Sequence, residues 1–152
     1  MLNVGIGTSI CDISCRGWIG RRGLMLENGR CALLVEDEAL VAMVAADALD
    51  EMGYQVIEAA SAALALQLAE INKDRINVAL IDLGLPDRPG EQLVGELRTL
   101  YPRMPIIVAS GKGPGAIDLS VQAHHDIIIL PKPYNFDDLQ SALSRLEHLL
   151  SG

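Results

Sequence analysis

The sequence is poor in aromatic and in basic residues. One Phe, one Trp and three Tyr occur among 152 residues, although half of the residues are hydrophobic. Because rings are so few, Leu, Val, Ile and Ala side chains must pack the core. Twelve Lys and Arg stand against twenty Asp and Glu, and the formal net charge is −8. Nucleic-acid binding depends on cations that neutralise phosphates, so this charge argues against DNA or RNA as a direct partner.

Paired cysteines, an export signal and long apolar runs are also missing. The cysteines are Cys11, Cys15 and Cys31, an odd number without a secretory signal, which favours a reducing compartment over a disulfide framework. No hydrophobic run approaches the ~20 residues of a membrane span. The sequence therefore predicts a cytoplasmic protein without a membrane partner. Its length predicts one domain with a substantial core.

The first thirty residues differ from the remainder of the chain. Residues 1–30 hold six glycines, two of the cysteines and the only Trp, and they show no clear period. We predict that 1–30 form a poorly ordered N-terminal extension and that a single domain spans 31–150. No further segment of domain size is predicted, so we expect a protein that works as this one domain.

Beyond the extension, short aliphatic runs alternate with segments of helical period. The aliphatic runs predict strands at 32–35, 54–59, 76–81, 106–109 and 127–130. Between the strands, Gly53 should end the first helix, and Ser61 and Asn135 should be N-caps. Only a short, glycine-weakened helix is expected near 116–124. Strict alternation of this kind is typical of an α/β fold, a doubly wound parallel sheet with helices on both faces.

The helical segments have apolar residues at helical spacing. In the first helix, Leu40 and Val44 repeat at this spacing, as do Ala45 and Leu49. We expect these residues to share a face of the helix.

Polar residues follow the strands at the points where each strand ends. Glu36 and Asp37 come after the first strand, Asp82 after the third, Ser110 after the fourth and Lys132 after the fifth. Any one of them could be an ordinary cap or turn residue. In a parallel sheet, however, ligands bind at the carboxyl ends of the strands, where all five side chains should meet.

Such a cluster has a definite chemistry. Three carboxylates that lie together repel one another unless a cation neutralises them. Mg²⁺ suits a cluster of oxygen ligands without His or Cys. A buried Lys and a hydroxyl then offer a charge and a hydrogen-bond donor to a phosphoryl group. Asp82 is the central choice for the residue that accepts this group, because it leaves the middle strand.

These motifs, in this order, resemble the receiver domain of bacterial two-component response regulators. They are LLVEDE at 33–38, LIDLGLPD at 80–87 with Gly90, the pair Ser110-Gly111 and the pair Lys132-Pro133. The resemblance covers about 31–150. It implies a CheY-like protein with a flavodoxin-like strand order 2-1-3-4-5.

The resemblance also implies a role for each site residue. Asp82 would accept a phosphoryl group from a histidine on a sensor kinase or a phosphotransfer protein. Asp37 would bind Mg²⁺ directly, Glu36 would bind it through water, and the carbonyl of Gly84 would be a further ligand. As implied partners of the phosphoryl group, Ser110 would donate a hydrogen bond and Lys132 would form an ion pair. The bond between Lys132 and Pro133 would be cis. The protein would signal to an unidentified downstream protein, and it would catalyse only its own phosphorylation and dephosphorylation.

Two features depart from the family pattern. The family usually has Tyr or Phe three residues before the Lys, where this chain has Ile129. The segment Gly113-Pro114-Gly115 also weakens the usual fourth helix. Ile129 is the main support for an alternative function, a phosphorylation-independent receiver-like module that binds proteins. A hydrolase with an Asp nucleophile is a third possibility, but no second acid follows two residues after Asp82.

Overall fold

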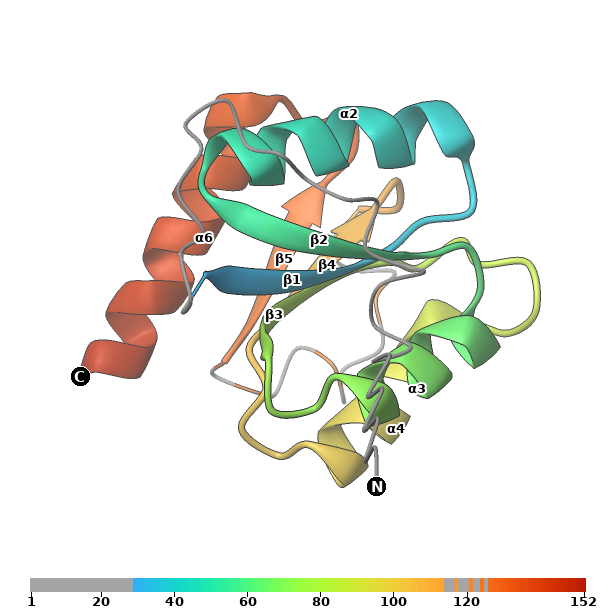
Figure 1. Cartoon of the computed structure of the whole chain (residues 1–152). Coiled ribbons are helices and arrows are strands. Elements are labelled where there is room, and N and C mark those ends of the chain that lie inside the picture. Colours follow the sequence, from blue (N-terminus) through green and yellow to red (C-terminus); the bar gives the residue numbers. More distant parts are fainter. Residues whose placement is uncertain (1–28, 114–116, 118–120, 122–123, 125) are drawn as a thin grey trace, which may run out of the picture.

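The computed structural model describes residues 29–113, 117, 121, 124 and 126–152. Within these residues the chain forms five strands and four helices (Figure 1). In chain order they are β1 (Arg30–Val35), α2 (Ala39–Glu51), β2 (Tyr54–Ala59), α3 (Ala62–Ile71), β3 (Ile76–Asp82), α4 (Gly90–Leu100), β4 (Ile106–Ser110), β5 (Ile127–Pro131) and α6 (Phe136–Ser151).

The five strands form one parallel sheet in the order β2-β1-β3-β4-β5. This confirms the predicted doubly wound α/β fold and the order 2-1-3-4-5. The strands are in register at their carboxyl ends, where Val35 pairs with Ile81 and Asp82 pairs with Ala109. Residues that follow β1, β3 and β4 therefore reach the same edge of the sheet.

Helices cover both faces of the sheet (Figure 1). α2 and α6 pack on one face, and α3 and α4 pack on the other. Alternate residues of β1 serve the two cores, because successive side chains of a strand point to opposite faces. Leu33 and Val35 belong to the core beneath α3 and α4, whereas Leu34 belongs to the core beneath α2 and α6.

The predicted helix ends are confirmed by local geometry. Gly53 follows α2 with φ of 90°, a left-handed conformation that residues with a side chain rarely adopt. The Ser61 side chain accepts a hydrogen bond from the Leu64 N–H at 3.2 Å and caps α3. At α6, Asn135 and Asp138 form a reciprocal capping box.

The apolar residues of α2 that were expected to share one face do not all do so. Leu40 and Val44 are 69% and 67% exposed, whereas Ala45 and Leu49 are each 1% exposed. The buried residues Ala42, Ala45 and Leu49 recur every three or four residues and form the face that meets the sheet, whereas Leu40 and Val44 lie on another face of the helix. The same holds on α3, whose buried residues are Ala62, Ala65, Leu68 and Ala69.

Two predictions fall largely outside the described residues. These are the extension at 1–30, of which only the last two residues are described, and the short helix near 116–124. Within the second segment, Ile117 and Val121 are described and are buried in the core beneath α3 and α4.

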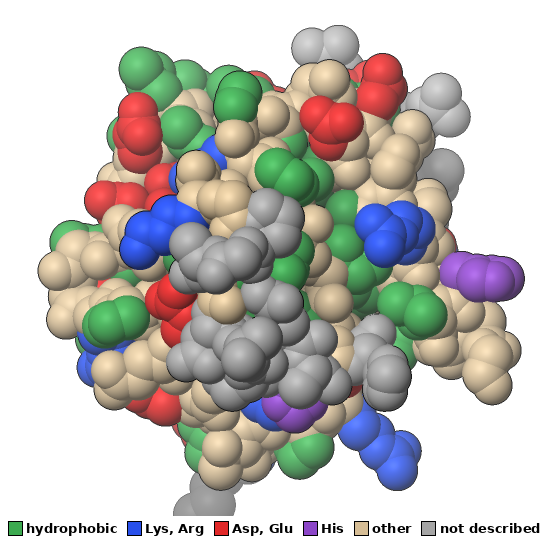
Figure 2. All heavy atoms as spheres, turned by 180° about the vertical axis from the view of Figure 1, so that it is seen from behind, with side chains coloured by type: hydrophobic (Ala, Val, Ile, Leu, Met, Phe, Trp, Pro, Cys, Tyr) green, Lys and Arg blue, Asp and Glu red, His purple; other side chains and the backbone are tan. Residues whose placement is uncertain are grey.

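In the described part of the chain, no helix is both long enough and apolar enough to span a membrane. Figure 2 shows one face of the molecule, on which acidic and basic side chains lie dispersed among apolar ones. Basic side chains do not form a single block on the part of that face that is described.

Candidate functional site

Three carboxylates meet at the carboxyl edge of the sheet, as the sequence predicts. Glu36 and Asp37 directly follow β1, and Asp82 is the last residue of the neighbouring strand β3. One carboxylate oxygen from each of the three lies within 4.8 Å of the others. Glu36 and Asp82 are buried, with 5% and 7% exposure, whereas Asp37 is exposed. Strand pairing therefore brings together acids that are far apart in the sequence.

Lys132 extends from the end of β5 to these acids. Its Nζ lies 2.9 Å from Oδ1 of Asp82 and 3.0 Å from Oε2 of Glu36. Its backbone N–H donates to the carbonyl of Ser110 at 2.8 Å, which holds the residue beside β4. The Lys132-Pro133 peptide is cis, as expected from the resemblance. One ammonium group thus contacts two buried carboxylates.

The pKa values of Glu36 and Lys132 reflect both their burial and their hydrogen bonds. Burial raises the pKa of the Glu36 carboxyl, and the hydrogen bond from Lys132 opposes this effect. Burial lowers the pKa of the Lys132 ammonium, but hydrogen bonds to Asp82 and Glu36 outweigh it, so this pKa is raised. The lysine is therefore charged at neutral pH.

Ser110 ends β4 next to Asp82 and is 2% exposed. Its Oγ accepts a hydrogen bond from the Lys112 N–H at 3.1 Å. The contact from the hydroxyl to the Lys112 carbonyl is longer, 3.4 Å, and is therefore weak. The hydroxyl hydrogen can turn to another acceptor while Oγ keeps the backbone N–H.

Two glycines fit closely around Asp82. A Cβ at Gly84 would lie 3.4 Å from Oδ2 of Asp82, so this residue borders the carboxylate. A Cβ at Gly90 would lie 2.5 Å from Cα of Leu83 and 2.7 Å from the carbonyl oxygen of Asp82. Helix α4 therefore begins directly against the end of β3. The sequence places Gly90 in a motif but does not reveal this approach.

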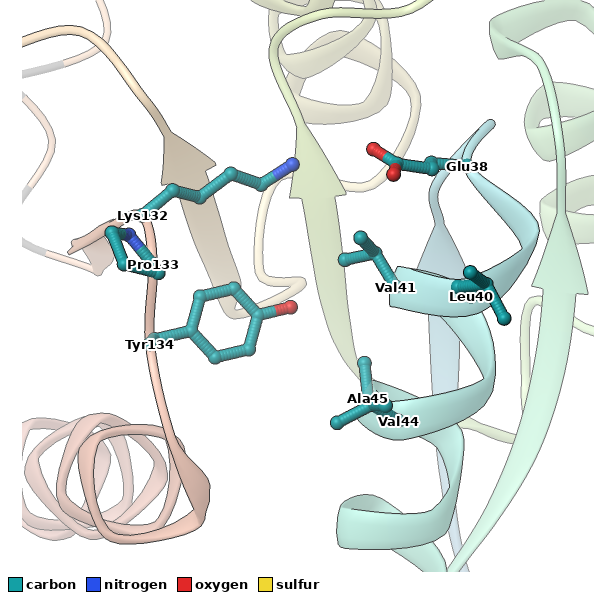
Figure 3. A pocket seen from close by; sticks show the side chains of 8 residues that line it. All are labelled: Glu38, Leu40, Val41, Val44, Ala45, Lys132, Pro133 and Tyr134. Atoms are coloured by element: carbon teal, nitrogen blue, oxygen red, sulfur yellow. The ribbon is translucent and has the colours of Figure 1, made fainter.

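A pocket of about 460 Å³ lies beside the cluster, between α2 and the segment that follows β5 (Figure 3). Its lining residues are Glu38, Leu40, Val41, Val44, Ala45, Lys132, Pro133 and Tyr134. The Tyr134 ring projects across the pocket toward α2, and the Lys132 side chain runs toward the end of β3. Burial raises the pKa of the Tyr134 hydroxyl. This pocket depends on how α2 packs beside the segment that follows β5, so local sequence patterns do not predict it.

The donor atoms fit Mg²⁺. All three side chains that converge offer carboxylate oxygens, and Mg²⁺ is usually held by one or two carboxylates, waters and phosphate oxygens. Asp37 is exposed, so one side of the cluster is open to water and to a substrate.

Comparison with known proteins identifies the family. The pattern of the response regulator receiver domain matches residues 32–144. The chain belongs to the response regulator receiver family. It is therefore related to the regulatory domains of two-component systems, and its fold is the CheY-like fold.

Curated relatives agree with this family. The chain is 32% identical over 121 residues to the sensor kinase CckA of Brucella abortus, covering 80% of this chain and 13% of the kinase. It is also 32% identical over 123 residues to the response regulator PhoP of Pseudomonas aeruginosa, covering 79% of this chain and 52% of that protein. The chain thus spans about half or less of the length of these two relatives.

Solved structures agree as well. The chemotaxis response regulator CheY4 of Vibrio cholerae superposes with a TM-score of 0.69 and 26% identity, covering 77% of this chain and 98% of that chain. The response regulator TrrA of Thermotoga maritima, solved in complex with Mg²⁺ and BeF, superposes with a TM-score of 0.65 and 25% identity. The superposition covers 77% of this chain and 98% of the TrrA chain. A receiver relative has thus been solved with the ion that suits the acidic cluster.

Ile129 lies on β5, where the family usually has an aromatic residue. It is partly buried and packs against the core beneath α3 and α4. A compact aliphatic side chain fills this position, so the chain has no aromatic ring at that point of β5.

Proposed function

We propose that the chain is a single-domain response regulator that accepts a phosphoryl group on Asp82 from a histidine kinase or a histidine phosphotransfer protein. The observation that carries this proposal is the convergence of Glu36, Asp37 and Lys132 on Asp82. Asp82 is the acceptor because it ends the central strand and contacts the lysine ammonium. The similarity to the response regulator CheY4, 98% of whose chain is covered, supports a receiver function.

In the proposed reaction, a carboxylate oxygen of Asp82 attacks the phosphorus of a phosphohistidine. An O–P bond forms and the P–N bond breaks, and its electron pair stays on the imidazole nitrogen, which takes up a proton. Negative charge develops on the phosphoryl oxygens. Lys132 would hold its ammonium against these oxygens, and the hydroxyl of Ser110 would donate to one of them. Hydrolysis of the resulting acyl phosphate would reset the protein.

Glu36, Asp37, Asp82 and the carbonyl of Gly84 would hold Mg²⁺. The bound ion supplies positive charge that neutralises the phosphoryl oxygens. The carboxylates of this chain are therefore needed both to bind the ion and, at Asp82, to accept the group. The protein would act on no other substrate, so its chemistry is limited to its own phosphorylation and dephosphorylation.

Signalling would occur in the cytoplasm through docking to a downstream protein or through a phosphorelay. A donor must bring its phosphohistidine to Asp82, beside which α2 presents exposed apolar side chains. We define the docking surface as Leu40, Val44 and Tyr134 around the pocket (Figure 3). An apolar surface next to the acceptor suits a transient protein partner. The net charge of −8 disfavours nucleic acid as that partner.

One observation favours a second candidate function. Ile129 replaces the aromatic residue that the family usually has on this strand. If that replacement removes the response to phosphorylation, the chain would be a phosphorylation-independent protein-binding module.

Intact mass after incubation with Mg²⁺ and acetyl phosphate tests the proposal. The wild type should gain one phosphoryl group, and Asp82→Ala should gain none. Asp74→Ala is the matched control, because Asp74 is exposed and lies before the opposite end of β3. Addition to Asp82→Ala would overturn the assignment of the acceptor. No addition to a wild type that binds Mg²⁺ would favour the binding module.

A further inference from the structure

The loop that follows Asp82 is tied to helix α3 by one side chain. Oδ1 of Asp87 accepts a hydrogen bond from the Ala62 N–H, and Oδ2 accepts one from the Ala63 N–H, both at 2.9 Å. The loop lies between β3 and α4, whereas α3 precedes β3 in the chain. The carboxylate therefore joins two segments that are separated by a whole strand.

Asp87 completes the cap of α3. The first N–H groups of a helix have no partner within the helix. Here Ser61 accepts from the Leu64 N–H, and Asp87 accepts from the two N–H groups before it. These hydrogen bonds lower the pKa of the Asp87 carboxyl, so it is ionised at neutral pH. The helix thus receives one local cap and one from the loop beside the acidic cluster.

The same loop carries Gly84, the residue that borders the Asp82 carboxylate. Backbone hydrogen bonds hold its two ends, from the Leu83 N–H to the Ala109 carbonyl at 3.1 Å and from the Gly90 N–H to the Leu83 carbonyl at 3.2 Å. Between these ends, Asp87 binds the loop to α3. A loop held in one conformation loses less entropy when a ligand binds it.

We propose that Asp87 is a positioning residue for the cation site, because it holds the loop that presents Gly84 beside Asp82. This inference rests on the proposed function, in which the Gly84 carbonyl is a ligand of Mg²⁺. Asp87 is not one of the three acids whose oxygens converge at the cation site, and its own oxygens accept from the N–H groups of α3. It acts through the backbone of residues 84–87.

The test compares Asp87→Ala with Ser61→Ala in the full chain. Both variants remove hydrogen bonds from the N-terminus of α3, but only the first releases the loop. By isothermal titration calorimetry, Asp87→Ala should bind Mg²⁺ about tenfold more weakly, the lower end of the loss seen when a contact that orients a ligand is removed. Ser61→Ala should bind it like the wild type. Asp87→Asn keeps one acceptor oxygen and should be intermediate.

Two further readouts separate positioning from a loss of folding. Hydrogen exchange of the Gly84 and Leu85 amides should become faster in Asp87→Ala and stay unchanged in Ser61→Ala, without any metal. With acetyl phosphate, the Mg²⁺ concentration for half-maximal rate should rise in Asp87→Ala, while the rate at saturating Mg²⁺ stays unchanged.

The outcomes are distinguishable. Equal Mg²⁺ affinity in Asp87→Ala and the wild type would overturn the positioning role and leave the proposed function intact. An equal loss in Ser61→Ala would also overturn it, since general destabilisation would then explain both. A wild type that binds no Mg²⁺ would overturn the proposed function and this inference together. If Asp87→Ala fails to fold by circular dichroism, Asp87→Asn decides by the same criteria.

Discussion

The ammonium of Lys132 lies between two buried carboxylates, 2.9 Å from Oδ1 of Asp82 and 3.0 Å from Oε2 of Glu36. The third carboxylate, Asp37, is exposed beside them. Three carboxylates and one ammonium leave two negative charges, which a divalent cation would balance. The lysine and the cation therefore compete for the same oxygens in the unmodified protein.

Replacement of the lysine should strengthen cation binding while it slows the chemistry. Two charges ~5 Å apart interact by ~3 kcal/mol at an effective dielectric constant of about 20, so Lys132→Met should bind Mg²⁺ at least about tenfold more tightly. Phosphorylation by acetyl phosphate should be slower, because the charge that stabilises the phosphoryl oxygens is lost. Calorimetry and intact mass measure the two effects.

The control for this variant is Lys112→Met, because the Lys112 side chain is exposed and contacts the site through its backbone. It should leave both quantities close to wild type. Weaker Mg²⁺ binding in Lys132→Met would contradict the competition between the lysine and the cation.

Cation binding should depend on the ionisation of Glu36. Burial raises the pKa of this carboxyl above its usual 4.5, although Lys132 opposes the shift. As the pH falls through the raised pKa, protonation of Glu36 should weaken Mg²⁺ binding, and this decline should begin at a higher pH than for an ordinary Glu. The affinity of Glu36→Gln should be lower and should lack this pH dependence. A wild-type profile that matches the variant would contradict the prediction.

The raised pKa of Glu36 affects the stability of the metal-free protein in the opposite direction, because low pH favours the folded state. A carboxyl whose pKa is higher in the folded state contributes stability that is complete below its unfolded pKa and is lost as the pH rises through the folded pKa. The free energy of unfolding of the wild type, relative to Glu36→Gln, should therefore decrease as the pH rises above about 4.5. Urea denaturation at several pH values measures this difference.

Two glycines of α4 should respond oppositely to alanine. A Cβ at Gly90 would lie 2.5 Å from Cα of Leu83, so Gly90→Ala should destabilise the protein by about 1–3 kcal/mol and slow phosphorylation of Asp82. A Cβ at Gly95 would meet nothing within 4 Å, and Gly95→Ala should stabilise by ~0.5–1 kcal/mol. Urea denaturation provides both values. Equal effects would show that helix propensity alone governs the two positions.

The docking surface predicts a difference between phosphodonors. Leu40→Glu places a charge on an exposed apolar side chain beside the pocket, so it should reduce transfer from a histidine phosphodonor at least about tenfold, as for a central interface residue. Phosphorylation by acetyl phosphate should not change, because this donor needs no protein contact.

The matched control is Leu150→Glu, since Leu150 is 54% exposed near the end of α6. Its transfer rates should equal those of the wild type. If Leu40→Glu slowed both donors equally, the effect would lie in the site itself and the docking role would be wrong.

Much of the fold follows from patterns that are local in the sequence. Aliphatic runs predicted every strand to within two residues at each end, and Ser61, Asn135 and Gly53 marked helix ends through short-range chemistry. Polar residues at the strand ends were also predicted to converge, and Glu36, Asp37, Asp82 and Lys132 lie together. These predictions succeed because the carboxyl ends of parallel strands share one edge.

What the sequence did not show depends on distances between elements. Leu40 is exposed because Ala42, Ala45 and Leu49 form the face of α2 that packs against the sheet. The hydrogen bonds from Ala62 and Ala63 to Asp87 join segments that local patterns cannot relate. The close approach of Gly90 to Asp82 likewise arises only when α4 docks. The spacing of residue types along the sequence does not predict contacts between distant elements.

The backbone at Asp82 is restrained from several sides. Asp82 pairs with Ala109 on β4, and the Leu83 N–H donates to the Ala109 carbonyl. Gly90 lies close to the carbonyl oxygen of Asp82. The main chain therefore has little freedom to recoil when the side chain becomes larger. Side chains near Asp82 must move instead. Ser110 can do so because the hydrogen bond from its hydroxyl to the Lys112 carbonyl is weak. Strand β3 therefore stays in place when Asp82 is modified. A structural change would instead begin in the turn that follows β4.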